Sequence, residues 1–270
     1  MKPSFLKTIA SLVFLLLIIS CNTPGSKVKV KNDIRYGEAI NDKNVNQALI
    51  MDMYYFEGNE IDRKKPVVVL VHGGGFNLGD KQQALYKKMA EAFVAAGYVA
   101  FSVNYRLAGT GTINVSALDN AVSDVLTAIR WIRMHSDEYE VDPGKMIIVG
   151  DSAGGGIVIN TAYSDSGKEM IKGCIDLWGG LRFNRLDKSA NQWGEPVNYY
   201  PIANDVPPTC IIHGDSDEVV PFRTSKDLAD ELDQLGVYHE FYVLKGALHY
   251  PEAMADQFIP KMISFADKIK

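Results

Sequence analysis

Hydrophobic positions along the chain follow two alternating periods from about residue 34 onward. Short apolar or alternating runs predict β-strands at residues 49–55, 67–71, 98–103, 146–149, 171–178, 209–212 and 240–244. Residues 67–71 form a continuous Val/Leu run, and continuous runs of this kind indicate strands buried on both faces. The pattern is typical of a parallel sheet covered by helices.

Between these runs, apolar residues recur at steps of three and four, as expected for helices that pack one face on a sheet. The clearest such stripe consists of Leu118, Ala121, Val122, Val125, Leu126, Ile129 and Ile132. Similar stripes occur at residues 82–96, 225–235 and 251–269. Because strands and helices alternate, we predict an α/β fold with a mostly parallel sheet.

One stretch, residues 179–208, shows neither period. It contains Trp193, Tyr199 and Tyr200, and Trp178 lies at its edge. Irregular stretches of this length inside a compact domain are often functional. We therefore expect this stretch to cover part of a site.

The first residues differ in kind from the rest. Lys2 and Lys7 precede and flank an apolar run at 9–19 that is too short to span a bilayer, which predicts an export signal at residues 1–20. The run ends at Ile18-Ile19-Ser20-Cys21, which resembles the lipobox of bacterial lipoproteins. We expect Cys21 to carry lipid and to anchor the exported protein to a bacterial membrane, on the periplasmic or outer-membrane face.

The alternative to lipidation is an ordinary cleaved signal with an incidental cysteine. In both cases residues 21–33 are polar and include Lys27, Lys29 and Lys31, so we expect a solvated tether there. No Pro/Gly/Ser-rich linker divides the chain after it. The remaining residues, 34–270, are predicted to form one catalytic domain.

Composition narrows the possible functions. An apolar fraction of 47% is sufficient for a sizeable core, and a net charge of −5 leaves no electrostatic footprint for nucleic acid. Cysteine and histidine spacing predicts no metal site. Cys174 and Cys210 lie in apolar runs, so we expect two buried hydrophobic side chains rather than a disulfide.

A glycine-rich stretch follows the apolar run at 146–149. It lacks the Gly-Lys-Ser/Thr ending of a P-loop and the second glycine of a dinucleotide fingerprint, so no phosphate-bearing cofactor is expected. Gly150-Asp151-Ser152-Ala153-Gly154 instead matches G-x-S-x-G between a predicted strand and a predicted helix. The glycines would leave room for a sharp turn that presents Ser152 as a nucleophile; the alternative is a plain glycine turn.

A second glycine-rich segment, His72-Gly73-Gly74-Gly75, follows the run at 67–71. Glycines there can direct backbone N–H groups to one point, as an oxyanion hole requires. We assign the donors to Gly74, Gly75 and Ala153, the last at a helix N-terminus. The alternative is a flexible loop.

A serine nucleophile needs a base and an orienting carboxylate. Of the five histidines, elimination leaves His249, in a loop between the last predicted strand and helix. Asp215, Asp217 and Glu218 follow the strand at 209–212 and are all possible acids. Spacing alone leaves the choice open, and all three could be solvated turn carboxylates.

Together these motifs resemble the hormone-sensitive-lipase-like esterases, and more narrowly the bacterial feruloyl and acetyl-xylan esterase-like branch. The resemblance rests on the segments 72–75, 104–107 (Asn-Tyr-Arg-Leu) and 150–155, on His213-Gly214 followed by Asp217, and on His249. It implies an α/β-hydrolase fold with an eight-stranded sheet. It also implies a Ser152, Asp217 and His249 triad without a cofactor, and it selects Asp217 as the acid.

Two departures from the family pattern change the expected site. Ala108-Gly109-Thr110 stands where many relatives have Ala-Pro-Glu. No long helical cap precedes the strands, so we expect no large cap domain and a shallow site covered mainly by residues 179–208.

The resemblance implies a carbohydrate substrate bearing acetyl or feruloyl esters. Trp178 and Trp193 are candidates for a sugar or aryl platform, although aromatic residues near a sheet edge more often serve packing. Two alternatives remain open. One is a general lipase, aryl-esterase or amide hydrolase, and the other is a non-catalytic lipoprotein that uses the fold to bind a partner.

Overall fold

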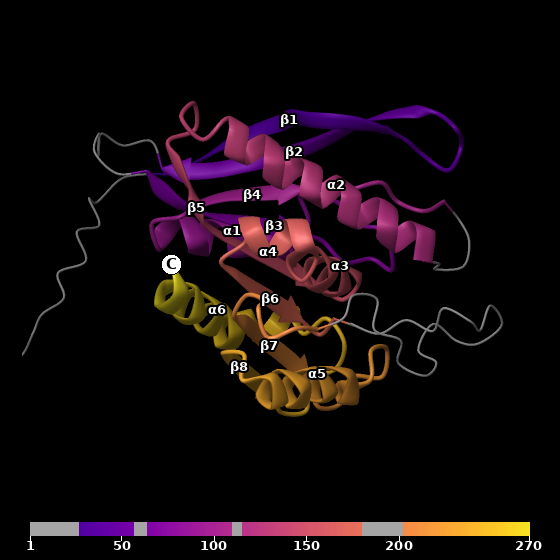
Figure 1. Ribbon diagram of the computed structural model, residues 1–270, viewed down its shortest axis with the longest axis vertical. Helices are drawn as coiled ribbons and strands as arrows, with labels where there is room; N and C mark the ends of the chain where they lie inside the picture. The colour runs from indigo at the N-terminus through magenta and orange to yellow at the C-terminus, as the bar shows by residue number, and fades with distance from the viewer. Residues whose placement is uncertain (1–26, 57–63, 110–114, 180–201) are drawn as a thin grey trace, which may run out of the picture.

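The computed structural model describes residues 27–56, 64–109, 115–179 and 202–270. A single eight-stranded sheet crosses the molecule, with helices packed on both faces (Figure 1). The strands are β1 Val28–Ile40, β2 Asn46–Phe56, β3 Lys65–Val71, β4 Val99–Val103, β5 Val141–Asp151, β6 Gly173–Leu177, β7 Thr209–Gly214 and β8 His239–Leu244. Their order in the sheet is β1-β2-β4-β3-β5-β6-β7-β8.

Most of the sheet is parallel, as predicted. The pairs β1/β2 and β2/β4 are antiparallel, and every pair from β4/β3 to β7/β8 is parallel. Because the carboxyl ends of parallel strands meet at one edge, the loops after β3, β5, β7 and β8 converge there. These loops carry Ser152, Asp217 and His249 of the predicted triad, together with Gly74 and Gly75.

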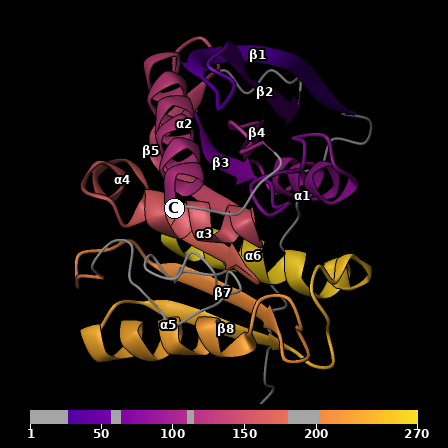
Figure 2. The ribbon, with the colours of Figure 1, turned by 90° about the vertical axis from the view of Figure 1, so that its right-hand side faces the viewer.

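Helices cover the two faces unequally (Figure 2). The helices are α1 Ala84–Ala95, α2 Val115–Met134, α3 Ala153–Ala162, α4 Asp165–Met170, α5 Phe222–Leu235, the 3₁₀ turn η1 Glu252–Met254 and α6 Ala255–Ile269. Side chains of α1 and α6 share one core cluster, and those of α2, α3 and α5 share the other. Both clusters include sheet residues, so the sheet is buried on both faces, as its continuous apolar strands predicted.

The N-terminal part of the sheet differs from the prediction. Strand β1 begins at Val28, so part of the segment expected to be a polar tether, 21–33, is strand. Among residues 28–40, only Ile34 and Tyr36 are buried, because β1 is an edge strand that is largely exposed. Val28 and Val30 alternate with lysines at the start of this strand, but the alternation is short and lies in the segment predicted to be the tether.

The other helices and strands differ less from the predicted ranges. Strand β5 extends from Val141, whereas the prediction began at residue 146, because Pro143 and Gly144 interrupt the apolar run. The short helix α4 was not predicted; it begins after Ser164, whose side chain accepts a hydrogen bond from the Gly167 amide.

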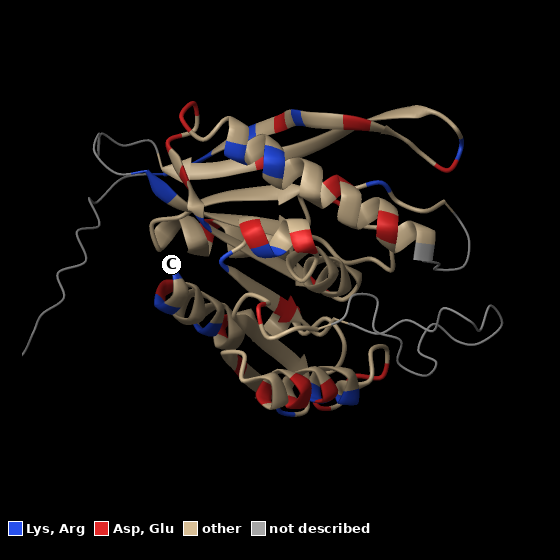
Figure 3. Ribbon diagram, viewed as in Figure 1, with Lys and Arg blue, Asp and Glu red and all other residues tan. Residues whose placement is uncertain are grey.

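Cys174 and Cys210 lie on neighbouring strands, β6 and β7, and both are buried and free, which confirms the prediction for them. Within the residues that the structure describes, no helix has the length and apolar character needed to cross a membrane. Acidic and basic residues are interspersed along α5 (Figure 3).

Candidate active site

Ser152 occupies the turn between β5 and α3 with a strained backbone, φ 50° and ψ −119°. The turn is possible because of its glycines. A Cβ at Gly150 would clash with the carbonyl of Gly154, and a Cβ at Gly154 would clash with that of Val71. The amide of Ser152 donates to the Leu177 carbonyl at 2.9 Å, which fixes the turn against β6. The side chain is therefore presented at the carboxyl edge of the sheet.

Three of the predicted side chains meet at this edge. His249 Nε2 lies 2.9 Å from Ser152 Oγ, and His249 Nδ1 lies 2.7 Å from Asp217 Oδ2. The carboxylate can only accept, so Nδ1 carries the proton and Nε2 is left to accept one from the serine hydroxyl. The Asp217 side chain is fully buried and that of His249 is 17% exposed, so the base stays accessible while the acid does not.

Asp217 is held by several donors. Its Oδ1 accepts hydrogen bonds from the amides of Val219 and Val220, at 2.8 and 2.9 Å. Burial alone would raise the pKa of Asp217, but the hydrogen bonds from His213, His249 and these amides hold it well below its usual range. The carboxylate therefore stays ionised, as an orienting group must.

The other two acid candidates lie outside this network. Asp215 is exposed and accepts a hydrogen bond from the Gly246 amide at 2.6 Å. Glu218 is exposed too. Only Asp217 of the three contacts His249 in the described structure.

The segment after β3 adopts conformations that favour glycine. Gly74 has φ 112° and Gly75 has φ 61°, and a Cβ at Gly74 would clash with the Leu78 carbonyl. Among the described residues, none accepts a hydrogen bond from the amides of Gly74, Gly75 or Ala153. Those amides are therefore available to a ligand.

Asp151 joins this segment to the serine turn, a role that the sequence motifs did not suggest. Its buried carboxylate accepts the Gly73 amide at 2.8 Å and the Tyr86 hydroxyl. Burial raises the pKa of Asp151 despite these donors. The only signal in the sequence was an acidic residue beside Ser152, in a turn whose neighbours are apolar or small.

Trp178 is not available as a substrate platform, which corrects the prediction for it. Its side chain is fully buried and packs edge-on against Phe258 of α6, with ring centroids 5.3 Å apart. The amide of Trp178 donates to the Ile212 carbonyl at 2.7 Å, and the backbone, at φ 40°, turns the ring into the core. The other platform candidate, Trp193, and the lipidation candidate, Cys21, lie outside the described residues.

A buried carboxyl that the triad does not use lies at the end of β6. Asp176 accepts the Gly179 amide at 3.1 Å, and a Cβ at Gly155, near the start of α3, would clash with its carboxyl group. Burial raises the pKa of Asp176 to about 7, although His213 and the Gly179 amide lower it. The native protein therefore retains a proton that the unfolded chain releases between about pH 4 and pH 7, and this group makes stability fall as pH rises through that window.

We predict that Asp176→Asn flattens this pH dependence. Asparagine keeps an acceptor oxygen and removes the charge, so the variant should match the parent near pH 4 and exceed its free energy of unfolding by about 2–4 kcal/mol at pH 8. Urea unfolding at pH 4, 6 and 8 measures the difference, with the exposed Asp233→Asn as control. Parallel curves for parent and Asp176→Asn would contradict the assignment.

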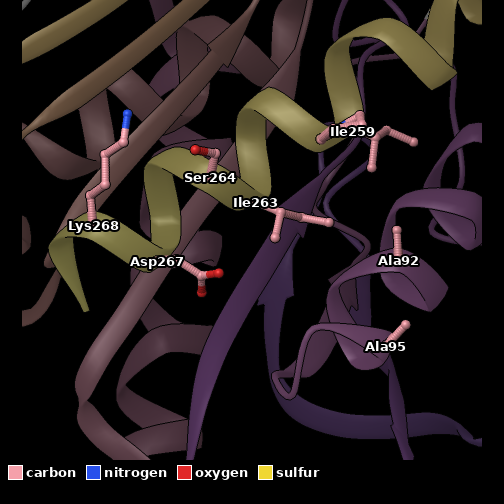
Figure 4. Close-up of a pocket in the computed structure, with 8 residues that line it drawn as sticks. Ala92, Ala95, Ile259, Ile263, Ser264, Asp267 and Lys268 are labelled. Carbon is pink, nitrogen blue, oxygen red and sulfur yellow. The ribbon is translucent and has the colours of Figure 1, made fainter. Parts of the chain in front are cut away.

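No group of three His, Cys, Asp or Glu side chains in the described part of the chain could hold a metal ion. A groove of about 760 Å³ lies between α1 and α6, with Ala92, Ala95, Ile259 and Ile263 among its lining residues (Figure 4). It contains none of the triad side chains.

Comparison with known proteins places this arrangement in a fold family. A carbohydrate esterase from gut microbiota, in truncated form, superimposes with a TM-score of 0.72 and 18% identity, covering 89% of this chain and 95% of the other. Esterase 2 of Thermogutta terrifontis superimposes with a TM-score of 0.69 and 26% identity over 91% and 93% of the two chains. The chain has the α/β-hydrolase fold.

Two family models match different parts of this α/β-hydrolase. The BD-FAE model matches residues 51–178, which include Ser152, and the prolyl oligopeptidase family model matches residues 182–269, which include Asp217 and His249. The resemblance inferred from the motifs is thereby confirmed. The two models match successive stretches of the chain, and strands from both stretches lie in the same eight-stranded sheet.

Curated relatives of this α/β-hydrolase are longer proteins. "Probable carboxylic ester hydrolase LipM" of Mycobacterium tuberculosis is 23% identical over 75% of this chain and 52% of its own length. "Para-nitrobenzyl esterase" of Bacillus subtilis is 35% identical over 47% of this chain and 27% of its own. The chain thus spans about half of the first relative and less of the second.

Proposed function

We propose that the protein is a serine carboxylic-ester hydrolase. The observation that carries the proposal is the continuous hydrogen-bonded path from Ser152 Oγ through His249 to the buried Asp217. A serine, an accessible imidazole and a buried carboxylate in this order can transfer an acyl group to water. The esterase names of relatives and structural neighbours support the same chemistry.

The proposed reaction has two halves. His249 Nε2 takes the proton of Ser152 Oγ as the oxygen attacks the ester carbonyl, and the imidazolium then protonates the departing alcohol. Water, deprotonated by the same nitrogen, next attacks the acyl-enzyme, and the proton returns to Ser152 as the acid leaves. Asp217 orients His249 and stabilises its charged form in both halves.

The oxyanion of each tetrahedral intermediate would be held by the amides of Gly74, Gly75 and Ala153. We predict that Gly74→Ala lowers kcat by about 10²–10³-fold, because the added Cβ would clash with the Leu78 carbonyl and displace these donors. Gly97→Ala is the matched control: φ there is +92°, yet the new Cβ meets nothing within 4 Å. Equal effects of the two substitutions on kcat would argue against an oxyanion role for this segment.

The substrate class that we propose is an acylated carbohydrate, with acetyl or feruloyl groups. The BD-FAE match and the carbohydrate-esterase neighbour support it. The test is a panel of acetylated xylan, feruloylated oligosaccharide and simple esters of increasing acyl length, with a chain that lacks residues 1–21. A preference for simple long-chain or aryl esters would favour the general lipase or aryl-esterase, and preferred cleavage of anilides would favour an amide hydrolase.

We also propose that the protein is exported and lipid-anchored through Cys21. The support is the sequence pattern at 1–21 alone. Cys21→Ser should move the protein from the membrane fraction to the soluble fraction of the producing bacterium while leaving ester hydrolysis unchanged. A variant that stays in the membrane fraction would rule out this anchor.

A further inference from the structure

A second histidine contacts the acid of the triad. His213, on β7, is fully buried, and its Nε2 lies 3.1 Å from Asp217 Oδ2 and 3.0 Å from the Val220 carbonyl oxygen. The same Oδ2 is the atom that His249 Nδ1 approaches at 2.7 Å. One carboxylate oxygen is therefore shared by two imidazole rings.

The surroundings fix where the proton of His213 resides. A carbonyl and an ionised carboxylate can only accept hydrogen bonds, so Nε2 must carry the proton and donate it. The other nitrogen, Nδ1, lies 2.6 Å from the hydroxyl of Ser225 on α5, which can donate to it. The orientation of the His213 ring is thus set by a buried serine.

Among the described residues, Phe222 and two carboxyl groups also lie around the ring. The edge of the His213 ring packs against Phe222, with centroids 5.8 Å apart at 87°. In the described part of the chain, the carboxyl groups that face His213 are those of Asp217 and, from β6, Asp176. The ring does not contact Ser152 or His249 in the described structure, so it can influence the reaction only through Asp217.

The Asp217 carboxylate is held at both oxygens. The amides of Val219 and Val220 hold Oδ1, and the two histidines hold Oδ2. His249 is the partner that moves protons, whereas His213 is fixed by Ser225. His213 can therefore keep Asp217 Oδ2 in place while His249 gains and loses its proton.

We propose that His213 is a positioning residue for Asp217, and that Ser225 in turn positions His213. The Nε2–H of His213 fixes the carboxylate oxygen that orients the catalytic imidazole. This inference rests on the proposed ester hydrolysis.

The test compares His213→Phe, which removes the donor, with His213→Gln, which keeps an N–H donor. His213→Phe should lower kcat for 4-nitrophenyl acetate by about 10–100-fold with KM changed less than about twofold, the scale of one hydrogen bond to a charged group. The acidic limb of its kcat/KM pH profile should move to higher pH, because Oδ2 then interacts with the proton of His249 alone. His213→Gln should remain within about fivefold of the parent.

Ser225→Ala is the second variant, since it removes only a hydroxyl and leaves the imidazole in place. It should lower kcat by about 3–10-fold and shift the downfield proton signal of the His249–Asp217 hydrogen bond, and Ser225→Thr should restore both. If His213→Phe does not fold, the kinetics of Ser225→Ala and His213→Gln test the positioning role of His213 instead. The matched control is His239→Phe, at the amino end of β8, because among the described residues the His239 side chain bonds only the Val237 carbonyl.

A folded His213→Phe with the kcat and pH profile of the parent would overturn the inference. A Ser225→Ala variant with an unchanged proton signal and kcat would overturn it too. A lowered melting temperature with unchanged kinetics would mean that the ring is only structural. If the parent protein itself hydrolyses no ester, the proposed function fails first, which the parent assay reveals separately.

Discussion

Ser152→Ala is expected to lower kcat for 4-nitrophenyl acetate by about 10⁶-fold. The serine hydroxyl is the atom that His249 Nε2 contacts, and alanine leaves no atom that could form the acyl-enzyme. The fold should persist, because the turn depends on Gly150, Gly154 and the Ser152 amide rather than on the hydroxyl. Initial rates of purified variant and parent measure the effect.

The control for this substitution is Ser123→Ala, an exposed serine on α2. It should leave kcat within about twofold of the parent, as expected for a surface change. If Ser152→Ala kept more than a few per cent of the parental rate, the nucleophile would have to be another residue.

Asp217→Asn is expected to lower kcat by about 10⁴-fold with little change in KM. The side-chain amide can present its N–H₂ group to His249, which favours the wrong tautomer of the imidazole and leaves its charged form without a counter-charge. Two amides and two histidines now donate to the carboxylate, so asparagine would also lose part of this network. Steady-state kinetics across pH 5–9 measure the effect.

Asp215→Asn is the matched control, because Asp215 precedes Asp217 by two residues and bonds the Gly246 amide on the surface. It should leave kcat within about twofold of the parent. A larger loss from Asp215→Asn than from Asp217→Asn would reassign the acid.

The buried strands were predictable because each has its own apolar signal. Residues 67–71 form a continuous Val/Leu run, and β3 covers the same run with two further residues at its start. Strand β1 has only a short alternation at its start, since most of its side chains face solvent and its place is set by pairing with β2. Which strands pair, and in which register, depends on tertiary contacts, so it cannot be predicted from local periodicity.

The site was partly predictable for a similar reason. The glycines around Ser152 are demanded by a local turn, so they appear as a motif. The choice among Asp215, Asp217 and Glu218 depends on which carboxylate turns inward toward His249, and the residues alone left it open. Family resemblance selected Asp217, which is the one that contacts His249.

Contacts made through buried polar groups were not predictable from spacing. Asp151 bonds an amide 78 positions away along the chain, and His213 reaches both Asp217 and a serine of α5. The prediction for Trp178 was wrong because an aromatic residue at a strand end can face either solvent or the core. Here the backbone turns the side chain into the core.

The central claim is that Ser152 is an activated nucleophile, and reaction with a fluorophosphonate tests it most directly. Intact and peptide mass spectrometry should show one adduct per chain, on the peptide that contains Ser152, and none on Ser152→Ala. Absence of an adduct on the folded parent protein, or an adduct that persists in Ser152→Ala, would contradict the claim.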